Sequence, residues 1–414
     1  MSRAFFIPLL SLLFTAGPAF ANESDWRQWR GPNGNGVAAS SAKPPLTWSE
    51  TQNVKWKAYI PGRGLSSPVV VGDLVLVTTA SEDGQFLLAY ARSDGSIRWK
   101  ERVHEGGIPT ELHRKNSAAT PTPASDGENV YVSFHNSDRV FLTAYTLKGE
   151  RLWHRDAGPY TCDYRYGYAP SPTLHGKKII ISAEFLADGF LAAFATDDGR
   201  ELWRTERKVK TSYSSPIVAS IGGRDQILLS GAAKVSAYDP ENGGILWQVD
   251  GSSSATCGTM VWSGDAVFAS GGFPNQETLA VSVGETPSVL WKNNDKSYEQ
   301  SLLYHDGHLY AFNDGGIALC WNAKTGEEKW KVRLGGPVSA SPTLAGGRIY
   351  AMNERGITYV YEPNSEQFIK LAENSLGDEG FATPVFVGNE AFLRAAKTEG
   401  ERKEWLYCLS ELED

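Results

Sequence analysis

Two long segments of the chain combine cationic, aromatic and amide side chains in a way that suits ligand binding. They run from Lys100 to Thr120 and from His154 to Ala169. Arginine and tyrosine supply directional hydrogen-bond donors on broad contact surfaces. The candidate binding residues are His104, Glu105, His113, Arg114, Lys115, Asn116, Asp163, Arg165, Tyr166 and Tyr168. We expect a site for an anionic ligand or a peptide, and the alternative is two solvated loops that pack on each other.

Other polar motifs carry less chemistry. His305 and His308 in HDGH have the spacing of a metal-binding pair, but they occupy a turn and have no third ligand nearby in the sequence, so we predict no metal site. Four aspartates recur in corresponding turns of different repeats: Asp83, Asp138, Asp188 and Asp314. Such turns favour aspartate for its local hydrogen bonds to the backbone, and the alternative is that the four carboxylates surround an ion. The chain has no GxSxG, HExxH, phosphate-binding-loop or dinucleotide fingerprint. The sequence does not exclude a catalytic triad, because the members of a triad are neighbours in space rather than in sequence.

The four cysteines form no motif, because none has CxxC spacing and none is vicinal to another. Cys320 and Cys408 lie in apolar runs where other repeats have alanine, so we expect small buried side chains there. Cys162 and Cys257 lie in polar loops, where free thiols or a disulfide are both open. A structural zinc site is not expected.

The tryptophans indicate which elements position these loops. Seven of them recur at intervals of 39 to 54 residues, and Phe368 follows as an eighth position: Trp56, Trp99, Trp153, Trp203, Trp247, Trp291 and Trp330. Five end the phrases DGSIRW, KGERLW, DGRELW, NGGILW and TGEEKW, with a glycine four residues before the tryptophan. A glycine at this place suits a tight turn with positive φ, and the tryptophan then closes a short strand.

A second phrase follows each tryptophan phrase. It consists of Ser-Pro or Thr-Pro and a β-branched run, as in SSPVVVGDLVLVTT and SPTLHGKKIIIS. Together the two phrases predict four short antiparallel strands in each repeat of about 45 residues, which is the size of a propeller blade. No long segment with a helical period competes with this interpretation.

The order of the two phrases predicts how the ring closes. The first tryptophan strand precedes the first Pro-type set, and the eighth set ends the chain at WLYCLSELED. We therefore predict an all-β fold, an eight-bladed β-propeller of four-stranded antiparallel blades, in which the N-terminal strand around Trp56 joins the last blade. Closure removes the exposed edges that an open array would have. Loops that lead from a tryptophan strand to the next Pro-type strand then surround the channel mouth, and both long segments are such loops.

The N-terminus predicts export. A positive start at Met1 to Arg3, an apolar run from Ala4 to Gly17 and a small-residue cleavage signal ending at Ala21 indicate a signal peptide over residues 1–21. The run is shorter than the roughly 20 apolar residues of a membrane span. We expect an N-terminal extension over residues 22–50, a propeller over residues 51–414, no lipid attachment, and a periplasmic or secreted protein that is soluble after cleavage.

Composition narrows the classes of partner. The 414 residues carry a formal net charge of -8, with 41% hydrophobic and 21% charged residues, so the chain is globular rather than disordered. Nucleic acids and anionic membranes are recognised by clustered lysine and arginine, and a net negative chain gives no such attraction. We expect no nucleic acid partner and no transmembrane segment in the mature chain.

One repeat matches a known motif in full. Ala237 to Trp247 reads A-x-D-x-x-x-G-x-x-x-W, which resembles the tryptophan-docking motif of the eight-bladed quinoprotein propellers that bind pyrroloquinoline quinone (PQQ). Partial copies end at Trp99, Trp203 and Trp330. The resemblance covers about residues 50 to 414 and implies that the seven periodic tryptophans stack against the neighbouring blade. The chain also resembles secreted PQQ-binding-like β-propeller repeat proteins, whose start is similar to DWRQWRGPNGNGV, and it resembles the propeller subunit of the outer-membrane β-barrel assembly machine.

This resemblance leaves two functions, because the superfamily contains quinone-dependent dehydrogenases and non-catalytic proteins. The dehydrogenases are implied to need a vicinal Cys-Cys pair, a calcium site and long inserted loops, and this chain has no Cys-Cys pair and little room for insertions. We predict an exported, monomeric, non-catalytic scaffold without a cofactor, which binds a protein or cell-envelope partner through the mouth loops. The alternative is a quinoprotein oxidoreductase acting on alcohols or sugars with PQQ and Ca²⁺, and a third candidate is a hydrolase or lyase that uses the channel mouth.

Overall fold

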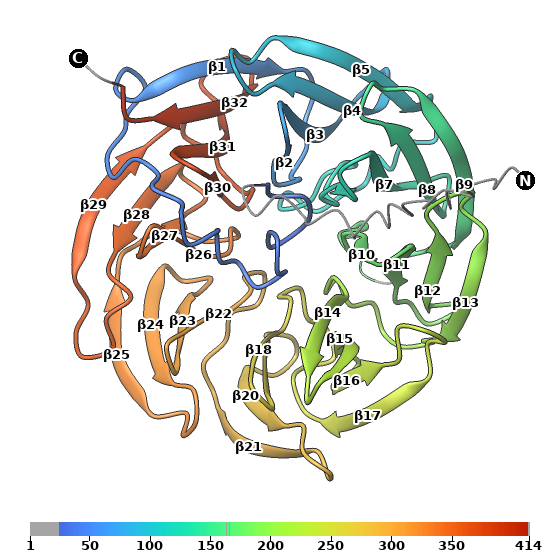
Figure 1. The fold of residues 1–414 in the computed structure, drawn as a ribbon, viewed down its shortest axis with the longest axis vertical. Helices are drawn as coiled ribbons and strands as arrows, with labels where there is room; N and C mark the ends of the chain where they lie inside the picture. The colour runs from blue at the N-terminus through green and yellow to red at the C-terminus, as the bar shows by residue number, and fades with distance from the viewer. Residues whose placement is uncertain (1–24, 163, 165, 413–414) are drawn as a thin grey trace, which may run out of the picture.

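The computed structural model describes residues 25–162, 164 and 166–412. These residues form eight four-stranded antiparallel sheets around a central axis (Figure 1), which confirms the predicted all-β, eight-bladed propeller. The predicted signal peptide over residues 1–21 lies outside the described residues. In the part of the chain that is described, no helix is long and apolar enough to cross a membrane.

We number the blades in chain order, and each has four strands from the channel outwards. Blade 1 contains β2 (Val69–Val71), β3 (Leu74–Ser81), β4 (Gly84–Ala91) and β5 (Ile97–His104), and blade 2 contains β6 (Ala124–Ser125), β7 (Asn129–Asn136), β8 (Arg139–Thr146) and β9 (Arg151–Pro159). Blade 3 contains β10 (Thr173–His175), β11 (Lys178–Ala183), β12 (Phe190–Ala195) and β13 (Glu201–Glu206), and blade 4 contains β14 (Ile217–Ile221), β15 (Arg224–Gly231), β16 (Lys234–Tyr238) and β17 (Ile245–Asp250). Blade 5 contains β18 (Val261–Ser263), β19 (Ala266–Gly271), β20 (Glu277–Ser282) and β21 (Ser288–Asn293), and blade 6 contains β22 (Leu303–His305), β23 (His308–Phe312), β24 (Ile317–Asn322) and β25 (Glu328–Arg333). Blade 7 contains β26 (Thr343–Ala345), β27 (Arg348–Met352), β28 (Ile357–Tyr361) and β29 (Lys370–Ser375), and blade 8 contains β30 (Val385–Val387), β31 (Glu390–Lys397), β32 (Lys403–Ser410) and β1 (Val54–Ile60).

The ring closes as the order of the phrases predicted. Strand β1 pairs antiparallel with β32, with Trp56 opposite Cys408, so the N-terminal strand is the outer strand of blade 8. In Figure 1 this blue strand lies beside the red C-terminal strands. The two ends of the propeller are therefore held together by a continuous sheet rather than by side chains alone.

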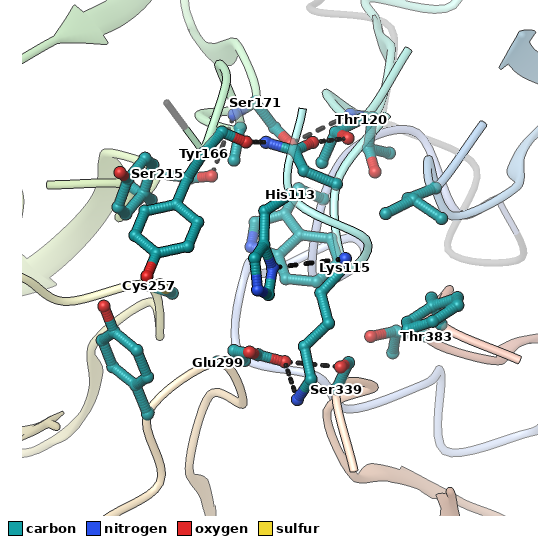
Figure 2. A pocket seen from close by; sticks show the side chains of 18 residues that line it. His113, Lys115, Thr120, Tyr166, Ser171, Ser215, Cys257, Glu299, Ser339 and Thr383 are labelled. Atoms are coloured by element: carbon teal, nitrogen blue, oxygen red, sulfur yellow. Dashed lines mark hydrogen bonds and ion pairs between the residues drawn. The ribbon is translucent and has the colours of Figure 1, made fainter. Parts of the chain in front are cut away.

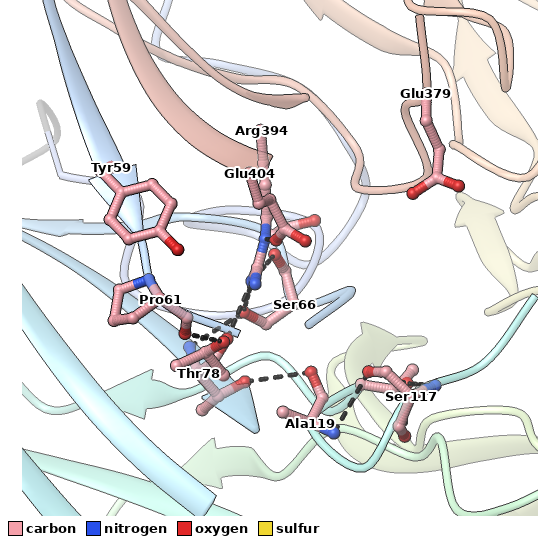
Figure 3. A network of polar contacts seen from close by, with 12 residues as sticks. Tyr59, Pro61, Ser66, Thr78, Ser117, Ala119, Glu379, Arg394 and Glu404 are labelled. Atoms are coloured by element: carbon pink, nitrogen blue, oxygen red, sulfur yellow. Dashed lines mark hydrogen bonds and ion pairs between the residues drawn. The ribbon is translucent and has the colours of Figure 1, made fainter. Parts of the chain in front are cut away.

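A buried ion pair adds a second closure between blades 8 and 1 (Figure 3). Arg394 on β31 pairs with Glu404 on β32, and both side chains are 2% exposed. The Arg394 guanidinium also donates to the Ser66 hydroxyl at 3.0 Å and to the Thr78 carbonyl at 2.8 Å, both in blade 1. Because removing either partner would leave a buried charge uncompensated, these contacts fix the position of blade 8 against blade 1.

Blade strands bury their faces according to their distance from the channel. Middle strands are enclosed by the blades on both sides, so every residue of β4 and β12 is buried, and β12 is a continuous apolar run. Outer strands such as β13 alternate between exposed and partly buried residues. Successive side chains point to opposite faces of a sheet, so the alternation marks a strand with one face at the surface.

The periodic tryptophans connect each blade to the next. Six of the seven indole N–H groups donate to a backbone carbonyl of the following blade at 2.8–3.1 Å. In five of these six cases the ring also lies over the phrase glycine of that blade: a Cβ on Gly199 would be 2.6 Å from the Trp153 ring, and a Cβ on Gly326 would be 2.5 Å from the Trp291 ring. The glycine is thus required for its positive φ and also for the space that the indole fills.

Two positions depart from this pattern. The indole of Trp247 donates to Gln226 of its own blade at 2.7 Å. The next phrase, SVGETPSVLW, has no glycine four residues before its tryptophan, but this absence alone does not explain the change, since Trp330 also meets a phrase without glycine and still donates to Asn364 of the next blade. The prediction for Phe368 was wrong. It lies before β29, in a longer connection, while Ala372 stands opposite Val360 where other blades have tryptophan. The Phe368 ring instead packs 5.4 Å from the Trp330 ring.

Cysteines take the small position opposite two of the tryptophans. Cys320 pairs with Trp330, and Cys408 pairs with Trp56, where other blades have alanine. Both thiols are buried, as predicted. A small side chain at this place leaves the tryptophan room to lie flat across the sheet.

Hydroxyl residues link neighbouring blades near the channel, at the place of the Ser or Thr in the Ser-Pro and Thr-Pro phrases; Thr259 and Ser301 hold this place in the two repeats that lack the proline. The eight residues at this position, which we call the hydroxyl belt, are all buried: Ser67, Thr122, Ser171, Ser215, Thr259, Ser301, Ser341 and Thr383. In six neighbouring pairs, the backbone N–H of one member donates to the hydroxyl oxygen of the next at 2.9–3.0 Å. The inner strands are too short to hold the ring together through their own faces, and the belt supplies a directional link at each of these joints.

The N-terminal extension covers one face of the ring. In Figure 1 its dark blue trace crosses the centre. Trp26 forms a bridge with Val70, and the Lys43 N–H donates to Gly388, next to the turns between the first and second strands of blades 1 and 8. Arg30 is 1% exposed and donates to the carbonyls of Leu302 and Pro342. The extension therefore closes the channel on the face opposite the mouth loops.

Removing a docked indole should destabilise the ring. Trp153 is 6% exposed, so Trp153→Ala should lower the free energy of unfolding by about 3–5 kcal/mol through lost burial and a cavity over Gly199. The matched control is Leu152→Ala, whose side chain is 48% exposed and which should cost less than about 0.5 kcal/mol. Urea titration followed by circular dichroism measures both, and equal losses would contradict the docking role.

The hydroxyl belt provides a second test with an internal control. Ser171→Ala leaves the buried Thr122 N–H without its acceptor and should cost about 1–3 kcal/mol. Within the described part of the chain, the Ser67 hydroxyl has no hydrogen-bond partner, so Ser67→Ala should cost less than about 0.5 kcal/mol. The same titrations apply, and the belt would have no energetic role if the two variants lost equal stability.

Candidate functional site

A cavity of about 230 Å³ lies in the channel, between the N-terminal extension and the mouth loops (Figure 2). All eight blades contribute lining residues, from Leu65 in the loop before blade 1 to Thr383 before blade 8. Trp29 of the extension also lines it, and its indole N–H donates to Thr259 of the hydroxyl belt at 2.7 Å. The cavity is therefore closed at one end by the extension and at its sides by the belt.

An ion cluster crosses this cavity. Lys115 belongs to the loop between blades 1 and 2, yet its ammonium lies 3.1 Å from Glu299 in the loop before blade 6 and 2.8 Å from Glu354 in blade 7. The Ser339 hydroxyl donates to Glu354 at 2.8 Å and also contacts Glu299. The loop of blade 2 is thus fixed to the opposite wall of the channel.

The electrostatics of the cluster favour the charged lysine. Burial by itself lowers the pKa of Lys115, but the carboxylates of Glu299 and Glu354 outweigh it and hold that pKa above its usual value. Burial raises the pKa of Glu299, even though Lys115 and Ser339 act in the other direction. Both pKa values are raised, which favours the charged lysine but disfavours the charged Glu299, because one ammonium is shared by two carboxylates and compensates neither of them fully.

Three tyrosines and one cysteine line the other side of the cavity. Tyr166, Tyr213, Cys257 and Tyr298 come, in this order, from the loops before blades 3, 4, 5 and 6. Burial raises the pKa of the Cys257 thiol well above its usual value and also raises the pKa of Tyr213. A thiolate is the reactive form of cysteine, so Cys257 is not an activated nucleophile. Cys162 lies 3.3 Å from the Tyr213 hydroxyl, and both cysteines are free thiols.

Four of the residues proposed from the sequence line the cavity: His113, Lys115, Asn116 and Tyr166. The two long loops pack directly against each other. The Asn116 side chain donates to the Tyr166 carbonyl, and the rings of His113 and Tyr166 lie 4.7 Å apart. Burial, then Arg114 and Lys115, lower the pKa of His113, which favours a neutral imidazole.

The remaining proposed residues lie elsewhere. His104 packs between blades, 4.9 Å from the Phe141 ring, where burial lowers its pKa to about 4. Tyr168 is 3% exposed and donates to the Ser182 carbonyl, so it belongs to the core. Glu105 and Arg114 are exposed at the mouth. Asp163 and Arg165 lie outside the described residues.

Several lining residues had not been proposed from the sequence: Trp29, Tyr213, Cys257, Tyr298 and Glu299. Four of them stand two or three residues before a belt residue, in the same loop of successive blades. Aligning these loop positions across the repeats would have found them. Trp29 lies outside the repeats, so its place in the cavity has no periodic signal.

Among the described residues, no group of three histidine, cysteine, aspartate or glutamate side chains lies close enough together to hold a metal ion. His305 and His308 are cross-strand partners at a turn on the face opposite the mouth. Asp314 accepts from the Tyr298 backbone N–H and lies 3.6 Å from Lys296. Asp314 thus has local partners.

The fold implies one cofactor, PQQ, which is a tricarboxylate. Such an anion needs cationic groups free to pair with it. Lys115 is the one lysine or arginine among the described residues that line the cavity, and it is already held by Glu299 and Glu354. Because these carboxylates would repel the cofactor, the residues of the cavity do not fit PQQ.

Comparisons with known proteins agree with the propeller. The family model described as "Outer membrane protein assembly factor BamB" matches residues 23–163, 163–314 and 276–367. A curated BamB from Burkholderia pseudomallei (strain K96243) is 29% identical over 216 residues, which are 51% of this chain and 51% of that protein. The match thus spans about half the length of this relative.

Solved structures share the architecture. BamB from Moraxella catarrhalis superposes with a TM-score of 0.60 at 14% identity, covering 85% of this chain and 98% of that chain. A europium-containing methanol dehydrogenase gives a TM-score of 0.69 at 12% identity, covering 94% and 99%. Identities this low show the fold alone, and that fold is common to binding proteins and enzymes.

The family match covers well over half of the residues, and it agrees with the docked tryptophans and the eight closed blades. The chain therefore belongs to the PQQ-type propeller family whose model is described as outer membrane protein assembly factor BamB.

Proposed function

We propose that this protein is an exported, non-catalytic propeller scaffold that binds a protein or cell-envelope partner through the loops at its channel mouth. The observation that carries the proposal is its membership of a family described as an outer membrane protein assembly factor. The name of that family also suggests the process, so we propose that the partner takes part in outer-membrane protein assembly.

The mouth loops have properties that suit a contact surface. Tyr166 is 38% exposed, and Arg114 beside it is exposed, while the backbone around both is held from below. Asn116 donates to the Tyr166 carbonyl, and the Arg63 guanidinium donates to the Arg114 carbonyl. Exposed arginine and tyrosine on a fixed backbone are typical of residues that dominate protein interfaces, because little conformational entropy is lost on binding.

The oxidoreductase alternative is not favoured, since the cavity has the wrong charge for PQQ and a protonated Cys257 in place of a vicinal cysteine pair. It remains directly testable. Purified protein incubated with PQQ and Ca²⁺ should reduce no dye over a panel of alcohols and sugars. Activity that disappears when mouth residues are changed would overturn the scaffold proposal.

Position-specific cross-linking tests the scaffold proposal. A photoreactive phenylalanine analogue at Tyr166 or Arg114 should cross-link one envelope component in living cells. The same analogue at Lys324, an exposed turn residue on the opposite face, is the matched control and should give none. Combining Arg114→Glu with Tyr166→Ala should lower recovery of that component about tenfold, as expected when interface anchors are removed. Equal cross-linking from Lys324, or none from the mouth, would refute the proposal.

A further inference from the structure

The cavity already holds an ammonium group, and that group belongs to the chain itself. Lys115 reaches across the channel, and its Nζ atom meets Glu299 at 3.1 Å and Glu354 at 2.8 Å. Figure 2 shows this side chain running toward Glu299 and Ser339, while Tyr166 and Cys257 face the same space from the other side. The two carboxylates and the serine hydroxyl thus form a receptor of the kind that binds a primary amine, with charged hydrogen bonds from two sides.

Lys115 alone does not neutralise the carboxylates on its side of the cavity. Glu299, Glu354 and Asp314 contribute three negative charges, and Lys115 and Lys296 contribute two positive charges. One negative charge is left over beside the cavity. The side chains of Glu299 and Glu354 are 24% and 7% exposed, so solvent screens this charge only in part.

An aromatic wall faces the same space. Tyr166, Tyr213 and Tyr298 line the cavity, and Tyr298 is next to Glu299 in the chain. The Lys296 ammonium lies 5.7 Å from the centre of the Tyr298 ring, which shows that this ring takes part in a cation–π contact. Aromatic faces attract cations through their quadrupole and also pack against an alkyl chain. Carboxylates beside tyrosine faces therefore select a ligand with a positive head and an apolar stem.

We propose that the cavity binds the alkylammonium group of a ligand, which enters from the mouth between Lys115 and the tyrosine wall and pairs with Glu299. Access is available at Tyr166 and His113, which line the cavity and are exposed at the mouth. The inference deepens the proposed function and rests on it, because it identifies the group that the mouth recognises. That group is a lysine side chain of the partner, or the same chemistry in a free amine.

Calorimetry with small probes tests the charge and shape of the ligand. Nα-acetyl-lysine methylamide and 1,5-diaminopentane should bind, whereas glutarate and 1-pentanol, of similar length but anionic or neutral, should not. Raising the salt concentration should weaken amine binding to the wild-type protein, because the contact is an ion pair. This measurement needs no variant. Binding of glutarate, or no binding of either amine at millimolar concentration, would overturn the inference.

Variants locate the site. Glu299→Gln should weaken amine binding at least about tenfold, because it removes the charged acceptor. Lys115→Met keeps the apolar stem but frees both carboxylates, so amine affinity should rise about tenfold. Glu327→Gln, at an exposed turn on the opposite face, is the matched control and should bind as the wild type does. Equal affinity in Glu299→Gln and Glu327→Gln, or weaker binding in folded Lys115→Met, would refute the site.

Different results would overturn the scaffold proposal and the ammonium-site proposal. Cross-linking from Tyr166 without any amine binding would leave the scaffold intact and overturn only the ammonium site. Amine binding without cross-linking would overturn the scaffold and leave a small-molecule site. Tighter binding of a lysine-containing peptide than of 1,5-diaminopentane identifies a partner side chain as the source, and the reverse order identifies a free amine. Both orders support the ammonium chemistry.

Discussion

The whole molecule depends on one contact that is repeated around the ring, an indole laid over a glycine of the next blade. A four-stranded sheet of this size cannot bury its two faces alone, so each blade is stable only when a neighbour covers it. The tryptophan provides the largest available flat surface, and its N–H donates to a carbonyl of the neighbour, which fixes the angle between the sheets. The glycine allows the approach, because a Cβ there would overlap the indole. Trp247 is the exception, because its indole takes a partner in its own blade.

Closing the ring in this way creates the channel, and the channel then has to be filled or sealed. The inner strands contribute few residues, so the hydroxyl belt links the blades there, and the extension seals one face with Trp29 and Arg30. Trp29 donates to a belt member, Thr259, and thereby couples the seal to the blades. The cavity is the space left between this seal and the mouth loops. Apart from Trp29, its lining comes from the loop before the inner strand of each blade, so the blades determine the shape of the cavity and the loop residues determine its chemistry.

The sequence predicted the parts of this structure that repeat. Blade number, strand order and closure followed from the tryptophan and proline phrases, and the alanine-like places of Cys320 and Cys408 followed from register. Phe368 was misplaced because a longer connection in blade 7 shifts the strand by four residues, so Ala372 takes the tryptophan position. Spacing within a repeat predicts a position only when the connecting turn keeps its length.

The candidate site was predictable only where a loop was long. Length drew attention to Lys115 and Tyr166, whereas Glu299 and Cys257 lie in short loops of ordinary composition. Lys115 and Glu299 are 184 residues apart, and their contact exists only because the blades that carry them face each other across the channel. His104 has the right type for a site residue, but it stands at the end of β5, where its ring packs between blades. Residue type and loop length thus show which segments are available, and the circular arrangement decides which of them meet.

The charge of the cavity explains how one architecture serves unlike functions. Eight loops surround the channel, and each places side chains close to the same small cavity. At such short distances, a change of one or two charges reverses the sign of the electrostatic potential in the cavity. A cavity with several free cations would attract a tricarboxylate such as PQQ. Here one lysine is shared by Glu299 and Glu354, so the same volume repels that cofactor and favours a cation. The contacts between blades do not depend on the charge of the cavity, because the docked tryptophans lie towards the outer strands and the charged loops lie at the mouth. The fold can therefore be retained while the ligand changes, and the residues that decide the ligand are those that the repeat does not specify.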